Sequence, residues 1–184
     1  MVVVFGWRFY RRYETTKAQQ ASLIYATMMS SAQEQQFQSA TAAAHGLIQK
    51  FPKTAYADFA HLWLAKQAVA TKHYQPALTA LLQVQTHGHM PALRQIAALR
   101  RGEIYQQLNQ PAKALAALKK TYDPAYLPKL AEIKGDAYHQ MGNKTQALYW
   151  YQKAQKALDT LQLSSPILEM KLADIPTTTH TNHH

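Results

Sequence analysis

The sequence predicts an all-α fold in which helices pair as hairpins and the hairpins repeat along the chain. The first observation is composition, because the 184 residues include 30 Ala and 20 Gln but only 12 Val plus Ile. Alanine is the strongest helix former, whereas β-branched residues favour strands. The second is the absence of cysteine, which excludes a disulfide scaffold, thiol catalysis and a cysteine-ligated metal site. The third is a long-period repeat, and the length fits one globular domain.

The first 13 residues differ in character from the rest of the chain. An apolar run over residues 1–7 leads into an aromatic and basic stretch that contains Arg8, Arg11 and Arg12. Seven residues cannot cross a bilayer, which takes about 20, but Trp, Tyr and Arg are typical of the level at which a spanning helix leaves it. We therefore predict that residues 1–13 are the end of a truncated transmembrane helix or a membrane-proximal leader.

Residues 14–176 are predicted to form one repeat domain that starts with a pair of helices. Between Thr15 and Lys50 the apolar residues fall on two stripes at helical spacing, which predicts two helices. The breaker Phe51-Pro52 ends this pair. We interpret it only as a helix hairpin, because its residues do not match the repeat that follows.

The repeat begins after Pro52. Small residues at Ala65, Gly102 and Gly135 lie 37 and 33 residues apart, and other positions match at the same offsets. The matching positions are Ala68, Tyr105 and Tyr138 near the end of each first helix, and Ala77, Ala114 and Ala147 in each second helix. Because one hairpin cannot bury its apolar face alone, we predict that successive hairpins stack into a common core. The small residues are predicted to lie where the two helices of a hairpin approach most closely.

The C-terminal part is predicted to contain a last, capping helix. Ser165 is the expected N-cap and Pro166 the first helical residue. Ile167, Met170 and Leu172 or Lys171 are expected to divide its inside from its outside. Residues 177–184, rich in Thr and His, are predicted to be a disordered tail.

The spacing of small, aromatic and Ala-Leu positions resembles the tetratricopeptide repeat, whose unit is about 34 residues. Read together with residues 5–10, 21–25 and 165–172, the whole chain resembles the YfgM family of ancillary SecYEG translocon subunits. That resemblance implies a solenoid of helix hairpins in the periplasm, held in the bacterial inner membrane by one N-terminal helix. It also implies the SecYEG translocon and periplasmic chaperones as partners.

The sequence contains no recognisable catalytic motif. A phosphate-binding glycine loop, an HExxH motif, a paired-carboxylate site and an activated serine are all missing from it. The nine His residues are scattered, and His87 and His89 share a loop without a third ligand nearby in sequence. We therefore expect no enzymatic activity, no cofactor and no metal site.

Function is then expected on the concave face that the first helix of each unit would line in a stacked array. The repeat register places six polar candidates for partner binding there: Lys66, Glu103, Gln106, Glu132, Asp136 and His139. Apolar residues share the same stripe, namely Phe59, Leu62, Val69, Ile96 and Leu99, and the alternative is that these are buried beneath a neighbouring helix. A mixed apolar and charged groove would suit an extended or helical segment of another protein.

Two functional hypotheses remain open at this level. The first is a membrane-anchored interaction module attached to the secretion channel. The alternative is a soluble cytoplasmic tetratricopeptide-like scaffold that uses the net charge of +10 to bind acidic protein or nucleic acid. The lysines are spread singly along the chain, so no nucleic-acid partner is expected. Arg8, Arg11 and Arg12 alone would favour a cytoplasmic domain by the positive-inside rule.

Overall fold

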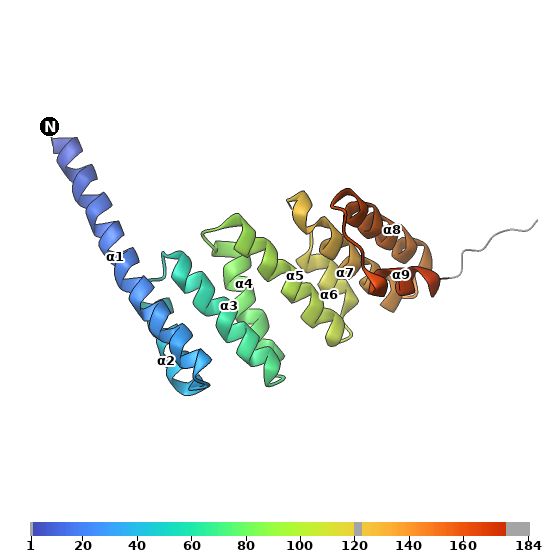
Figure 1. Ribbon diagram of the computed structural model, residues 1–184, viewed down its shortest axis with the longest axis horizontal. Helices are drawn as coiled ribbons and strands as arrows, with labels where there is room; N and C mark the ends of the chain where they lie inside the picture. The colour runs from blue at the N-terminus through green and yellow to red at the C-terminus, as the bar shows by residue number, and fades with distance from the viewer. Residues whose placement is uncertain (1, 120–122, 176–184) are drawn as a thin grey trace, which may run out of the picture. The chain divides into compact units, whose positions relative to one another are not determined.

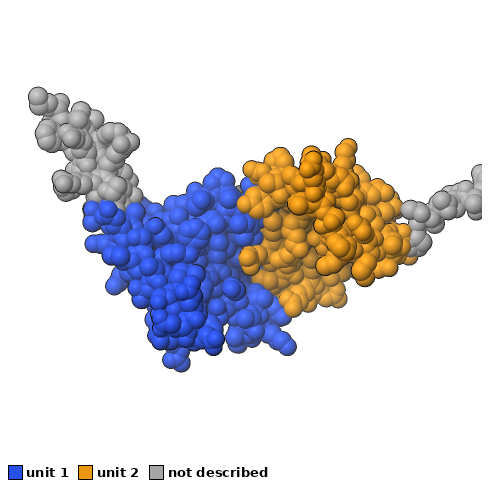
Figure 2. All heavy atoms as spheres, in the orientation of Figure 1, with its two compact units in different colours: residues 1–97 blue, residues 98–184 orange. Residues whose placement is uncertain are grey.

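The computed structural model describes residues 2–119 and 123–175, with side chains from residue 16 onward (Figure 1). Across these residues the chain forms nine α-helices and a single turn of 3-10 helix, and no strand. The predicted all-α hairpin fold is therefore confirmed. The chain divides into two compact units, Met1–Ala97 and Ala98–His184 (Figure 2). The predicted tail over 177–184 lies outside the described residues.

Unit 1 consists of two helix hairpins and the start of a fifth helix. Its elements are α1 (Val2–Gln33), α2 (Phe37–Lys50), α3 (Ala55–Ala70), α4 (Tyr74–His87) and the first part of α5 (Pro91–Gln107). Helix α1 contacts α2 and α3, and small residues such as Ala21, Ala40 and Ala44 fill that core with Met28 and Leu47. Helix α1 is continuous across the predicted boundary at residue 13, and the side chains of residues 1–13 lie outside the described part.

Membrane-spanning segments were considered for every helix. Along the part of the chain that the structure describes, no helix combines the length and the apolar character that crossing a bilayer requires.

Unit 2 contains the rest of α5 and two further pairs of elements. These are α6 (Pro111–Ala117), the 3-10 turn η1 (Pro124–Tyr126), α7 (Leu127–Gln140), α8 (Lys144–Thr160) and α9 (Pro166–Ala173). Helix α7 packs along α8, and α9 packs on α8. One core cluster joins Leu99 of α5 to Leu118, Leu130 and Ile133, and a second joins Ala131 and Ala147 to Tyr151, Ala154 and Leu168.

The same turn joins the two helices of each hairpin. One residue in each turn takes a left-handed conformation, and these residues are Gln35, Lys72, Asn109 and Gly142, with φ of 60°, 61°, 53° and 73°. The N–H of the next residue donates to a carbonyl five positions back, at 2.7 to 2.9 Å, which is the Schellman helix ending. Their spacing of 37, 37 and 33 residues equals the repeat offsets. The α1–α2 pair is therefore a further unit of the same repeat, which corrects our interpretation of it as an unrelated hairpin.

Side-chain volumes are complementary where the two helices of a hairpin meet. A Cβ built on Gly102 would lie 3.1 Å from Ile133 and 3.4 Å from Leu118, and one built on Gly135 would overlap the ring of Tyr151. By register, a small residue faces a large one in every unit: Met28 with Ala44, Ala65 with Leu81, Gly102 with Leu118, and Gly135 with Tyr151. All eight are buried. The predicted close approach at Gly135 is present, with Tyr151 as the residue opposite.

Candidate interaction surfaces

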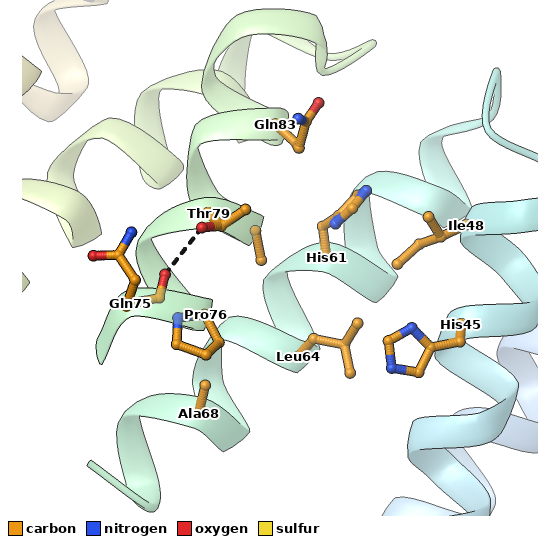
Figure 3. A pocket seen from close by; sticks show the side chains of 10 residues that line it. His45, Ile48, His61, Leu64, Ala68, Gln75, Pro76, Thr79 and Gln83 are labelled. Carbon is orange, nitrogen blue, oxygen red and sulfur yellow. Dashed lines mark hydrogen bonds between the residues drawn. The ribbon is translucent and has the colours of Figure 1, made fainter. Parts of the chain in front are cut away.

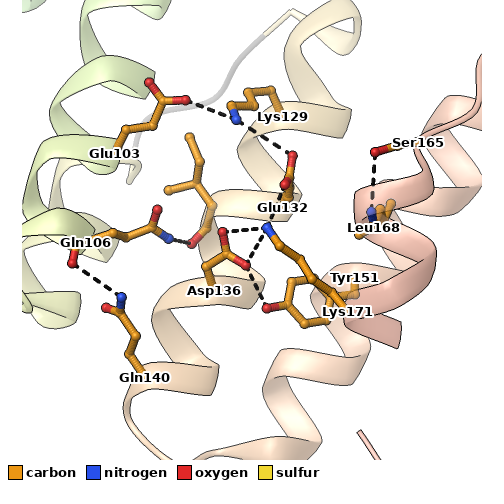
Figure 4. A network of polar contacts seen from close by, with 11 residues as sticks. Glu103, Gln106, Lys129, Glu132, Asp136, Gln140, Tyr151, Ser165, Leu168 and Lys171 are labelled. Atoms are coloured by element: carbon orange, nitrogen blue, oxygen red, sulfur yellow. Dashed lines mark hydrogen bonds and ion pairs between the residues drawn. The ribbon is translucent and has the colours of Figure 1, made fainter. Parts of the chain in front are cut away.

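An alternating chain of charges crosses unit 2 and joins four of its helices (Figure 4). Lys129 Nζ of α7 lies 3.0 Å from Glu103 Oε1 of α5 and 3.7 Å from Glu132 Oε2. Lys171 Nζ of α9 lies 2.6 Å from Glu132 Oε1 and 2.8 Å from Asp136 Oδ1. The hydroxyl of Tyr151 on α8 donates to the same Asp136 oxygen at 2.7 Å. Each carboxylate of α7 is thus compensated by a lysine.

The protonation states in this network follow from burial and charge. Partial burial alone would lower the pKa of Lys171, but hydrogen bonds to Asp136 and Glu132 and their negative charges outweigh it and raise that pKa. Lys129 behaves in the same way beside Glu103. Burial, the hydrogen bond to Asp136 and the nearby negative charges raise the pKa of Tyr151 above its ordinary range. Both ammonium groups stay charged and the phenol stays a donor at neutral pH.

Helix α9 is the element that closes this surface. The side chain of Ser165 accepts from the N–H of Leu168 at 3.3 Å, and Pro166 opens the helix, as predicted. Leu168 and Ile175 are buried in the cluster on α8, with Leu172 packed beside them. Ile167 and Met170 are 62% and 68% exposed, so the inner face is set by the leucines and Lys171.

The structure gives most of the six predicted partner-binding residues a role within the chain. Glu103, Glu132 and Asp136 form the charge network. The amide of Gln106 donates to the carbonyl of Ile133 at 2.6 Å, which ties α5 to α7. Lys66 and His139 are exposed and make no polar contact with described residues. In unit 2, the face predicted to receive a partner therefore holds the chain's own α9.

The apolar residues predicted for the same stripe are partly covered. Leu99 is buried in the core of unit 2, so its assignment to an open groove is wrong and the alternative of burial applies. Phe59 lies against Tyr25 of α1, with ring centroids 5.6 Å apart. Leu62, Val69 and Ile96 are half-buried.

Unit 1 has its main hollow on another face, between α2, α3 and α4. Its volume is about 540 Å³, and Figure 3 shows His61 and Leu64 of α3 between the α2 and α4 side chains. At about 100° per residue, the face of α3 holding His61, Leu64 and Ala68 points roughly 150° away from the predicted face of Phe59 and Lys66. Sequence spacing identified two faces of α3 but not which one remains open.

Histidines gather around this hollow although they are scattered in the sequence. A second hollow of about 450 Å³ shares Ile48, His61 and Gln83 with the first and adds His87 and His89. The N–H and Nδ1 of His89 lie 2.7 and 3.0 Å from Oδ2 of Asp58, whose side chain is buried. Among the described residues, no three His, Asp or Glu side chains are placed to hold a metal ion.

Acidification is expected to destabilise unit 1 through His61. Burial lowers the pKa of His61 from its ordinary 6.5, nearby Asp58 offsets part of this, and nearby His45 lowers it further. The unfolded chain therefore takes up a proton at this residue before the folded chain does, so the free energy of unfolding falls as the pH drops through about 6.5. Thermal melts at pH 7.5 and 5.5 measure the effect. The His61→Gln variant should show a smaller pH-dependent shift, and the exposed His139→Gln variant should behave like the parent. Equal shifts in all three proteins would contradict this role for His61.

Comparisons with known proteins agree with this architecture. Residues 1–177 match the family model described as a tetratricopeptide repeat-like domain. The "Ancillary SecYEG translocon subunit" of Haemophilus influenzae is 31% identical over 172 residues, which are 94% of this chain and 83% of that protein. Proteins of the same name from Aggregatibacter actinomycetemcomitans and Escherichia coli are 30% and 26% identical, over 86% and 92% of this chain and 78% and 81% of their own lengths. No solved structure matches the chain. The chain, with its tetratricopeptide repeat-like domain over residues 1–177, therefore belongs to the family of ancillary SecYEG translocon subunits.

Proposed function

We propose that this protein is a non-enzymatic subunit that binds the SecYEG translocon through its repeat domain and engages periplasmic chaperones. The observation that carries the proposal is the match to named translocon subunits over about four fifths of their length. Hairpin repeats support it physically, because their helix faces expose side chains on a scaffold held rigid by the hairpin cores. The proposal includes an inner-membrane anchor formed by residues 1–13 and a repeat domain in the periplasm.

Lys66 of α3 and His139 of α7 are the appropriate positions for testing partner binding. They are the two predicted residues that remain exposed without an internal polar contact. Reversal of the charge at Glu132 or Asp136 would instead disrupt the Lys171 contacts and would confuse loss of binding with loss of structure.

Site-specific photocrosslinking in membranes tests the proposal directly. A photoreactive amino acid at position 66 or 139 should crosslink to a SecYEG component or a periplasmic chaperone, whereas one at the exposed Lys144 of α8 serves as the control. If no translocon component is captured from either position or pulled down by the unmodified parent, the proposed association is wrong. Capture of the translocon equally from all three positions would retain the association and reject these first-helix positions as its site.

Protease accessibility tests the proposed topology separately. A protease that reaches only the periplasm should cleave the repeat domain in spheroplasts, while the domain in intact cells stays uncut. Cleavage only from the cytoplasmic side would overturn the periplasmic assignment and favour the cytoplasmic scaffold.

A further inference from the structure

Unit 2 carries a second cluster on the side formed by α7 and α8, which we name the lysine–tryptophan platform: Lys134, Tyr149, Trp150 and Lys153. Lys134 Nζ lies 4.3 Å and Lys153 Nζ 4.9 Å from the centroid of the Trp150 ring. Tyr149 meets Trp150 edge to face at 5.4 Å and is 52% exposed. Two ammonium groups therefore lie over one indole, beside an accessible phenol.

Neither platform lysine has a carboxylate partner. Lys134 and Lys153 form no ion pair with any described residue, whereas Lys129 and Lys171 of the same unit each contact two carboxylates. Burial lowers the pKa of Lys134, and the positive charge of Lys153 lowers it further. Contact with the ring face favours each cation, but the repulsion between the two remains uncompensated. An anion placed between them would remove that repulsion.

The repeat itself shows that the fold does not require these residues. The offsets of 37 and 33 place Trp150 in register with Ala43, Ala80 and Ala117, so the other units carry a methyl group at this position. Lys134, Tyr149 and Lys153 correspond to Leu64, Thr79 and Gln83, and together with Ala80 these three line the open hollow of unit 1. Unit 2 thus builds a cationic aromatic surface at positions where unit 1 has a neutral hollow.

We propose that the lysine–tryptophan platform binds an acidic segment of a partner protein, whose carboxylates pair with Lys134 and Lys153 across the face of Trp150. Charge complementarity selects the occupant, because the platform offers two close cations and an aromatic surface. A bilayer is a poorer fit, because Trp150 packs against both hydrophobic clusters of unit 2 and its indole is not free to insert. The assignment does not depend on the translocon proposal.

NMR of the three tryptophan indole N–H groups tests the site on the full chain. A blocked hexaglutamate peptide should shift the Trp150 resonance saturably while leaving Trp7 and Trp63 unchanged, and added NaCl should weaken the binding. The Lys134→Gln/Lys153→Gln variant should bind about fivefold more weakly or worse. A Lys50→Gln/Lys113→Gln variant removes the same charge at exposed sites elsewhere and should stay within about twofold of the parent.

Further variants and one competing ligand keep the proposal falsifiable. The Lys134→Arg/Lys153→Arg variant keeps both charges and should retain binding, and the single Lys153→Gln variant should give a partial loss if the double variant fails to fold. Equal weakening by the platform and control pairs would reduce the effect to net charge and overturn the site. A Trp150 shift with phosphatidylglycerol vesicles but not with the peptide would assign the platform to a lipid surface and reject the acidic segment.

Discussion

The Gly135→Ala variant is expected to lose about 2 to 3 kcal/mol of folding free energy and to melt roughly 5 to 10 °C below the parent. A Cβ at position 135 would overlap the ring of Tyr151. That ring is buried, with 2% of its surface exposed, and its hydroxyl is bound to Asp136. The ring therefore cannot move aside without disturbing both the core and the charge network.

Two other glycines supply the controls for this thermal-melt series. A Cβ on Gly46 of α2 would meet nothing within 4 Å, so Gly46→Ala should be neutral or stabilising by up to about 1 kcal/mol through helix propensity. Gly102→Ala, with Ile133 at 3.1 Å, should fall between the two. Identical melting temperatures for the Gly46 and Gly135 variants would show that the close approach is absent.

A second substitution should recover much of the loss. The Gly135→Ala/Tyr151→Leu pair recreates the combination of Ala65 with Leu81 found in the second unit. If volume complementarity is the cause, the double variant should be more stable than the sum of the single effects predicts. Strict additivity would instead attribute the Gly135→Ala loss to something other than the contact with Tyr151.

The Lys171→Glu variant is expected to release α9 from unit 2. The change would place a third carboxylate against Glu132 and Asp136, where Lys171 now lies at 2.6 and 2.8 Å. Loss of a partly buried, doubly paired charge should cost about 2 kcal/mol or more. Limited proteolysis within residues 161–165, the connection before α9, should become faster, because the docked helix no longer holds its end.

Lys156→Glu is the matched control for this charge reversal. Lys156 is exposed on α8 and forms no ion pair with described residues, so the same change in net charge should leave the proteolysis rate unchanged. Equal acceleration in both variants would reject the Lys171 contact as the cause. Because the pKa of Lys171 is raised, its contribution is fully present below the ordinary 10.5 and is lost only as the pH rises through the raised value.

Local sequence patterns were sufficient to predict the all-α fold, the hairpin contacts and the start of the last helix. Helical periodicity and the recurrence of Gly102, Gly135 and Ala147 depend on residues near one another in the chain, and the Ser165-Pro166 signal is contained within one turn. The register of the first hairpin was missed because Met28 and Ala44 exchange the large and small positions of the later units. The common backbone turn at Gln35 and Lys72 has no glycine to mark it.

The availability of the candidate surface was decided only by tertiary contacts. Glu132 and Asp136 carry the same charges whether they face solvent or a partner, and nothing local indicates that Lys171, 39 and 35 residues later, neutralises both. The hollow of unit 1 likewise depends on three helices whose side chains leave space between them. Helix periodicity assigns residues to faces, but which face is covered depends on packing between segments that are distant in sequence.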